Sequence, residues 1–64
     1  MECKIEGLIK ESGLRKDHIA KYLGISTKQL RNYETGISLI PIDKAFKLAH
    51  MLNKKVDDLY IFEQ

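Results

Sequence analysis

Apolar side chains recur at three- and four-residue spacing in successive stretches of the chain, and each stretch stops at a glycine or an asparagine. In the first stretch Ile5, Leu8 and Ile9 carry this spacing, and Ser12-Gly13 follows. Such spacing is typical of amphipathic helices, and glycine tolerates the left-handed backbone conformation found at helix ends. The pattern therefore predicts a first helix that ends near Gly13.

A second helix is predicted over residues 16–23, where Ile19 and Ala20 repeat the spacing and Gly24 follows. Arg15 precedes it at the position where a serine or threonine would cap the helix with its side-chain oxygen. The missing cap should cost about 1 kcal/mol of helix stability.

A third helix begins at Ser26, which forms a capping box with Gln29 three residues later. Leu30 and Tyr33 then share its apolar face, and Gly36 ends it. The only residues between the second and third helices are Gly24-Ile25-Ser26. Two short helices joined by a tight turn that begins with glycine form a helix-turn-helix, which we predict over about residues 16–35.

The rest of the chain predicts a loop over residues 37–41, a fourth helix and a short last turn over residues 56–60. Pro41 suits the first turn of a helix, and Asn53 can adopt the left-handed conformation that ends one. The apolar stripe of the fourth helix consists of Ile42, Ala45, Phe46, Ala49 and Leu52. No stretch alternates like a strand. The predicted fold is all-α, a single compact domain of five short helices over residues 1–64.

Composition argues against several classes of protein. The 64 residues allow one small core but no deep substrate cavity, and no catalytic constellation is evident, so we predict no enzyme. Cys3 is the single cysteine, and together with His18 and His50 it matches no familiar zinc spacing. Neither a membrane-spanning run nor a signal peptide is recognisable. We expect a cytoplasmic protein that binds no metal, cofactor or small-molecule substrate and does not associate with a membrane.

The net charge of +2 does not by itself indicate nucleic acid, so the positions of the charges matter. With Leu30 and Tyr33 pointing inward, the other side of the third helix presents groups that can pair with base edges in the major groove. The candidate base-reading residues are Thr27, Lys28, Gln29, Arg31 and Asn32. The alternative interpretation is a solvated polar face, which most exposed helices have.

Candidates for contacts to DNA phosphates lie at the ends of the second and third helices. Arg15 and Lys16 stand at the start of the second helix, whose free N–H groups also attract anions. The alternative is a solvated basic pair. The hydroxyls of Ser26 and Thr35, at the two ends of the third helix, are further candidates. Glu34 is expected to be partly buried, with a structural role.

The residues from Gly13 to Leu59, about three quarters of the chain, resemble the lambda-repressor/Cro-like helix-turn-helix family of bacterial and phage regulators. The matching landmarks are Gly13-Leu14, Ile19-Ala20, Leu23-Gly24-Ile25-Ser26, Leu30, Tyr33-Glu34-Thr35-Gly36, Ile40-Pro41-Ile42, Lys47-Leu48-Ala49 and Val56-Asp57-Asp58-Leu59. The resemblance implies a compact domain that binds duplex DNA, usually as a dimer, and controls transcription.

The apolar tail Tyr60-Ile61-Phe62 either folds back onto the core or packs against a second copy. The resemblance favours the second interpretation, a homodimer in which Tyr60, Ile61 and Phe62 form contacts.

The chain departs from this family's pattern at three places. Arg15-Lys16 stand where members often have serine or threonine followed by glutamine. Ile9 stands where many members have an arginine that pairs with the residue matching Glu34, so the partner of Glu34 is open. The loop Ile37-Ser38-Leu39 is uncharged where the family's loop is often basic, which puts one usual phosphate contact in question.

The leading hypothesis is a sequence-specific transcriptional regulator, a repressor or Cro-like switch that binds a double-stranded DNA operator as a homodimer. The alternative is a protein-interaction module, such as an antitoxin or a regulator whose main partner is another protein. The outward face of the third helix distinguishes the two, because a protein-binding face would carry exposed aromatic or aliphatic side chains there.

Overall fold

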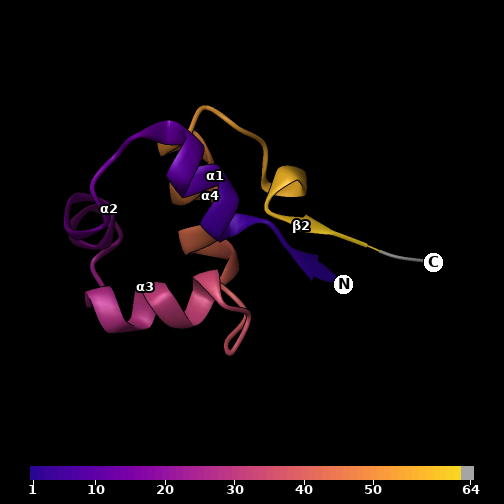
Figure 1. Cartoon of the computed structure of the whole chain (residues 1–64), viewed down its shortest axis with the longest axis horizontal. Coiled ribbons are helices and arrows are strands. Elements are labelled where there is room, and N and C mark those ends of the chain that lie inside the picture. Colours follow the sequence, from indigo (N-terminus) through magenta and orange to yellow (C-terminus); the bar gives the residue numbers. More distant parts are fainter. Residues whose placement is uncertain (63–64) are drawn as a thin grey trace.

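The computed structural model describes residues 1–62, which form four α-helices, one 3₁₀ turn and two short strands (Figure 1). The helices are α1 (Ile5–Ser12), α2 (Lys16–Leu23), α3 (Thr27–Glu34) and α4 (Ile42–Met51). The 3₁₀ turn η1 covers Val56–Asp58, and the strands are β1 (Glu2–Cys3) and β2 (Tyr60–Ile61). The predicted helical fold is confirmed, and none of the helices within residues 1–62 is long and apolar enough to cross a bilayer.

The two strands form a small antiparallel sheet that the sequence pattern does not predict. Glu2 lies opposite Ile61, and next to this pair the Lys4 N–H donates to the Leu59 carbonyl at 2.8 Å. Strands of two residues are too short to show alternation, so their pairing follows from the fold that brings both ends together. The predicted fifth helix is correspondingly only the single 3₁₀ turn Val56–Asp58.

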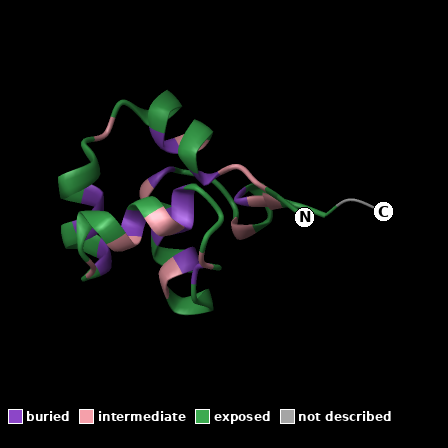
Figure 2. Cartoon of the chain, turned by 60° about the horizontal axis from the view of Figure 1, so that its bottom comes forward, coloured by how far each residue is buried: buried purple, intermediate pink, exposed green. Residues whose placement is uncertain are grey.

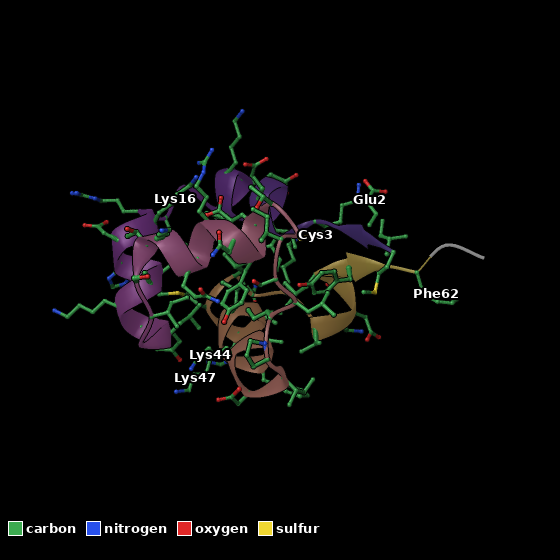
Figure 3. All side chains as sticks on the ribbon, turned by 90° about the horizontal axis from the view of Figure 1, so that it is seen from below. Glu2, Cys3, Lys16, Lys44, Lys47 and Phe62 are labelled. Carbon is green, nitrogen blue, oxygen red and sulfur yellow. The ribbon has the colours of Figure 1, made fainter. Side chains whose placement is uncertain are left out.

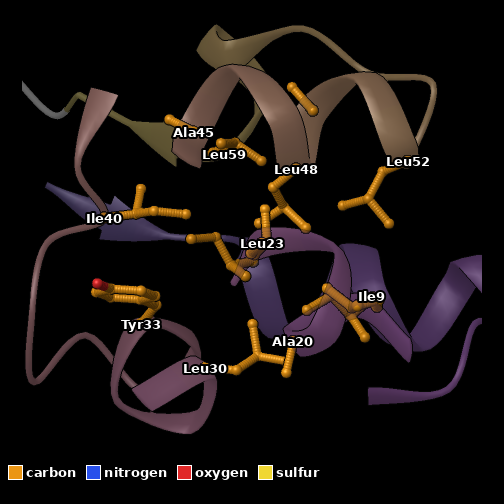
Figure 4. Close-up of a cluster of buried hydrophobic side chains, with 13 residues drawn as sticks. Ile9, Ala20, Leu23, Leu30, Tyr33, Ile40, Ala45, Leu48, Leu52 and Leu59 are labelled. Carbon is orange, nitrogen blue, oxygen red and sulfur yellow. The ribbon is translucent and has the colours of Figure 1, made fainter. Parts of the chain in front are cut away.

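The core lies between the helices and the segment that follows η1, with buried positions on the inner sides of the helices (Figure 2). Each α-helix contributes a side chain that is 0% exposed, as does the residue before β2: Ile5, Ile19, Leu30, Leu48 and Leu59. These side chains meet in one apolar cluster, most of which is labelled in Figure 4. Burial of each large aliphatic side chain stabilises the fold by about 1.5–3 kcal/mol.

The inner side of α4 differs from the predicted stripe. Ala45, Ala49 and Leu52 are buried as expected, but Ile42 is 67% and Phe46 63% exposed. At about 100° per residue, the buried positions cluster on one side of the helix, and Ile42 and Phe46 lie on its flank. The prediction that these two residues belong to the core is therefore wrong, because the buried side of α4 is turned toward Leu48, so the other elements cover one side of the predicted stripe and leave Ile42 and Phe46 in solvent.

The helix ends agree with the sequence pattern. Gly24 follows α2 with φ of 73°, and Asn53 follows the end of α4 with φ of 58°, the only non-glycine residue with positive φ in the described chain. Arg15 provides no side-chain cap for α2, as expected. Pro41 lies just before α4, as its N-cap.

Candidate nucleic-acid interface

The turn between α2 and α3 is held by local hydrogen bonds. The Ile25 N–H donates to the Ala20 carbonyl at 3.0 Å, which closes the end of α2 behind Gly24. Ser26 caps α3, since its Oγ accepts from the Gln29 N–H at 3.1 Å. The hydrogen bonds of residues 1–62 include this half of the predicted capping box but not the reciprocal bond, in which the Ser26 N–H would donate to the Gln29 side chain. These bonds therefore fix the end of α2 at Gly24 and the start of α3 after Ser26, which keeps the turn between the two helices short.

The inner side of α3 is anchored to the core and to the N-terminal strand. Leu30 is 0% and Tyr33 4% exposed, which confirms the core position predicted for Tyr33. The Cys3 thiol donates to the Tyr33 carbonyl at 3.2 Å, with a longer contact of 3.6 Å to the Glu34 carbonyl. Since these carbonyls lie at the last turn of α3, the thiol ties that end of the helix to β1.

Of the five candidate base-reading residues, Lys28, Arg31 and Asn32 lie opposite Leu30 and Tyr33 at about 100° per residue, and Thr27 and Gln29 lie on the flanks of α3. Thr27, Lys28 and Arg31 are exposed, and Gln29 and Asn32 are half-buried. Large apolar side chains are absent from the exposed positions of α3, since its aliphatic and aromatic residues are all in the core. This side can offer ammonium, guanidinium, amide and hydroxyl groups to a partner. Base readout by these five residues remains a prediction.

The two basic residues at the start of α2 have different surroundings. Arg15 is widely exposed, and within the part of the chain that the structure describes it pairs with Asp17 alone, with Nε at 3.3 Å from Oδ1. The Lys16 ammonium lies 3.0 Å from Oε2 of Glu34, a carboxylate whose side chain is 0% exposed. Lys16 therefore links α2 to the end of α3, and it lies beside α3 in the view from below (Figure 3).

This ion pair identifies the partner of Glu34. Neither Glu34 carboxylate oxygen has a hydrogen-bond partner within residues 1–62 beyond the approach of Lys16. A buried carboxylate is strongly unfavourable without a countercharge, so Lys16 has a structural role in addition to any phosphate contact. The sequence pattern missed this role, because periodicity relates positions within one helix and gives no information about pairs across two helices.

The two hydroxyls proposed for phosphate contact are used differently. Ser26 Oγ accepts from the Gln29 N–H, which leaves its own proton available to donate. Thr35 Oγ1 already donates to the Arg31 carbonyl at 3.0 Å, so it would have to give up that bond to donate to a phosphate. Phosphate contacts by Arg15, Lys16 and both hydroxyls remain predictions.

One part of the tail folds back onto the core, and the other part stays exposed, where a second copy could pack against it. Tyr60 folds back, is half-buried and accepts a hydrogen bond from the Ile40 N–H at 3.2 Å through its hydroxyl. Burial raises the pKa of Tyr60 above its usual value of 10.0, and the bond from Ile40 partly opposes that rise. Ile61 and Phe62 are 44% and 75% exposed. A dimer contact by this tail remains a prediction, and residues 63–64 of the predicted domain lie outside the described chain.

Comparisons with known proteins agree with this geometry. The profile of a helix-turn-helix family of Cro/C1 type matches residues 5–59. No curated protein sequence matches the chain significantly. Among solved structures, a transcriptional regulator from Listeria innocua is similar, with a TM-score of 0.77 and 25% sequence identity. The similarity covers 100% of this chain and 64% of the chain of that regulator.

Proposed function

The chain belongs to the Cro/C1-type helix-turn-helix family, whose members bind double-stranded DNA, and from this premise we propose a sequence-specific transcriptional regulator. In this proposal α3 reads base edges in the major groove, and the chain binds its operator as a homodimer. The regulator acts as a repressor or a Cro-like switch, because occupying an operator excludes other proteins and requires no activity besides duplex binding.

The observation that carries the proposal is the chemistry of the exposed side of α3. Lysine and arginine can pair with guanine O6 and N7, amides with adenine, and a threonine methyl group with thymine. Lys28, Arg31 and Asn32 provide such groups from one side of a helix whose other side is fixed by Leu30 and Tyr33. A rigidly held helix presents these groups in a constant geometry, which sequence recognition needs.

Contacts to the DNA backbone come in this proposal from the start of α2. Arg15 is the stronger candidate, because its ion pair with Asp17 is exposed and such pairs are worth little. Lys16 can reach a phosphate only while it also neutralises Glu34. Phosphate contacts position the protein without reading sequence, so Arg15 should contribute to affinity for every duplex alike.

The alternative of a module whose α3 binds another protein receives no support from that helix. Its exposed side carries polar and cationic groups and none of the exposed aromatic or aliphatic side chains that dominate protein interfaces. Exposed apolar residues occur elsewhere, among them Ile37, Leu39, Ile42 and Phe46.

Selection of bound sequences from random duplex DNA, followed by binding at increasing salt, tests the proposal. Selection should yield a near-palindrome with half-site centres roughly 10 base pairs apart. About three phosphate contacts from each of two protomers should give a slope of log affinity on log salt of about −5. An affinity that does not change between low and moderate salt would contradict the proposal.

Two substitutions separate readout from anchoring. Asn32→Ala should cost about 1–3 kcal/mol on the selected site and little on random DNA, whereas Arg15→Ala should weaken both by similar factors. Lys54→Ala is a matched control, because Lys54 follows α4 and lies near Leu8 and Glu11 of α1 rather than near α3. Equal losses on both DNAs for Asn32→Ala would remove it from the set of base-reading residues.

A further inference from the structure

The chain turns back sharply at the end of α4 and lays the following segment beside that helix. Asn53 has φ of 58°, and its N–H donates to the His50 carbonyl at 3.1 Å. The Lys54 N–H donates to the Ala49 carbonyl at 2.8 Å. Together these bonds form a Schellman motif, in which a residue in the left-handed conformation reverses the chain over the last helical turn. The segment between α4 and η1 is therefore held in a fixed position against α4.

A shallow depression of about 310 Å³ lies between the end of α4 and this segment. We call it the α4–η1 depression. It is lined by three apolar residues, two lysines and a histidine: Phe46, Ala49, Val56, Lys54, Lys55 and His50. Phe46 is 63% exposed, so one wall of the depression is an aromatic ring in solvent. An exposed aromatic ring beside a concave apolar surface is typical of an interaction site.

The positive charge of the chain is concentrated around this depression. Residues 44–56 contain four lysines and no aspartate or glutamate. The rest of the chain contains seven lysine and arginine residues and nine acidic residues, so its net charge is −2. None of the four lysines makes an ion pair within the part of the chain that the structure describes. This segment therefore attracts a partner with the opposite charge.

The α4–η1 depression lies away from the helix that is proposed to read DNA. In Figure 1 α3 is at the bottom of the molecule, whereas the segment between α4 and η1 passes over the top. A duplex contacted by α3 therefore leaves this depression open to a second partner.

We propose that the α4–η1 depression docks an acidic amphipathic segment of a partner protein. Apolar side chains of that segment cover Phe46 and Val56, and its carboxylates pair with Lys54 and Lys55. The backbone of this site is already fixed by hydrogen bonds, so little ordering is needed when the partner binds. The inference goes beyond the proposed function and does not depend on it.

Two other kinds of ligand fit this surface less well. Duplex DNA offers phosphates to the lysines, but its backbone has no apolar surface that would cover Phe46. A small molecule normally has about 70–90% of its surface buried in its site, which a shallow depression does not provide. An acidic peptide segment matches both the apolar lining and the charge.

Selection from random peptides tests the chemistry of the partner. A displayed library of peptides of about 16 residues, long enough for several helical turns, is selected against the wild-type chain. The enriched peptides should contain more aspartate and glutamate than the unselected library, with apolar residues at three- and four-residue spacing. No enrichment, or enrichment of peptides without acidic residues, overturns the inference.

Two pairs of charge reversals locate the bound peptide. One enriched peptide is labelled and titrated by fluorescence anisotropy with Lys54→Glu/Lys55→Glu and with Lys28→Glu/Arg31→Glu. Both double variants alter exposed side chains and change the net charge equally, so both should keep the wild-type circular dichroism spectrum. The first should raise the Kd of the peptide about tenfold or more, whereas the second, on α3, should leave it unchanged. Equal effects, or a loss in the α3 variant alone, overturn the inference.

Phe46→Ala tests the apolar part of the site. It should raise the Kd of the same peptide about tenfold, because truncating an aromatic anchor inside an interface has an effect of this size. Ile37→Ala is the matched control, since Ile37 is 75% exposed in the loop before α4 and does not line the depression. An unchanged affinity in Phe46→Ala overturns the inference, as does an equal loss in Ile37→Ala.

Failure of docking and failure of DNA binding are separate outcomes. Peptide binding is measured without DNA, whereas the proposed function is measured by salt-dependent binding of the wild-type chain to a duplex. Adding a saturating duplex should leave the Kd of the peptide unchanged at physiological salt, where long-range repulsion is screened. Displacement of the peptide by the duplex overturns the inference, because the two ligands would then share one surface.

Discussion

The two helices α3 and α4 both bury apolar side chains on the side that faces the core, but their exposed sides carry different kinds of side chain. Leu30 of α3 and Leu48 of α4 are both 0% exposed. On the outer side α3 presents Lys28 and Arg31, whereas the flank of α4 presents Ile42 and Phe46. The polar and cationic side chains of α3 are favourably hydrated in the free protein. The apolar side chains of α4 are removed from water only when another molecule covers them, and that removal is favourable.

This difference shows that an exposed face can be specialised without affecting the fold. A side chain that lies mostly in water contributes little to folding, so its chemistry can match a ligand. Polar and cationic groups on α3 fit the base edges and phosphates of DNA, and aliphatic and aromatic groups on α4 fit another protein surface. Substitutions on the two sides of each helix should therefore affect stability and binding separately.

The largest expected effect separates the two sides of α4. Leu48→Ala should lower the free energy of unfolding by about 2–5 kcal/mol, because it leaves a cavity in the core. Phe46→Ala should change it by less than about 0.5 kcal/mol in the monomer. Urea unfolding at about 1 μM protein measures both. A loss of similar size for the two variants would mean that Phe46 packs within its own chain.

The next effect concerns the ion pair that fastens α2 to α3. Lys16→Met should cost about 3 kcal/mol, because the Glu34 carboxylate would be left buried without a countercharge; the partial exposure of Lys16 places the cost at the lower end of the usual range. Replacing both residues by methionine should recover most of the loss. Urea unfolding of Lys16→Met, Glu34→Met and the double variant completes this double-mutant cycle. If the two single changes in the free energy of unfolding simply add up to that of the double variant, the two side chains do not interact directly.

A smaller effect has opposite signs for folding and binding. Arg15→Ser should stabilise the fold by about 1 kcal/mol, because Arg15 already has the extended N-cap backbone but no capping oxygen. The same change should weaken binding to any duplex, since it removes a cation near the phosphates. Ser26→Ala is the control at the start of α3, where loss of the cap should destabilise by a similar amount. Thermal unfolding and duplex titration provide the two readouts.

The smallest effect tests the attachment of the loop that leads into α4. Because burial raises the pKa of Tyr60 above 10.0, its contribution to stability is fully present below pH 10 and declines as the pH rises through the folded-state value. Tyr60→Phe should cost about 1 kcal/mol at neutral pH, from the lost bond to Ile40, and should reduce the alkaline decline. Unfolding measured on both sides of pH 10 checks this, with the exposed Tyr22→Phe as control.

Most of the helical framework could be predicted from neighbouring residues. Apolar spacing located the four α-helices, Gly24 and Asn53 marked two of their ends, and Ser26 identified the cap of α3. The candidate base-reading side of α3 followed from the same helical periodicity, because Leu30 and Tyr33 identify the side of the helix that faces the core. These features depend on residues within one or two turns of each other, so local sequence contains the necessary information.

Contacts between distant segments were not contained in that local pattern. The pairing of β1 with β2, the approach of Lys16 to Glu34 and the exposure of Phe46 each depend on how separate elements are placed against one another. An apolar residue on a helix shows that burial would be favourable, but only the packed fold shows whether a neighbouring element reaches it. Helix position and capping therefore follow from the chain itself, whereas the partner of each exposed or charged side chain follows from packing.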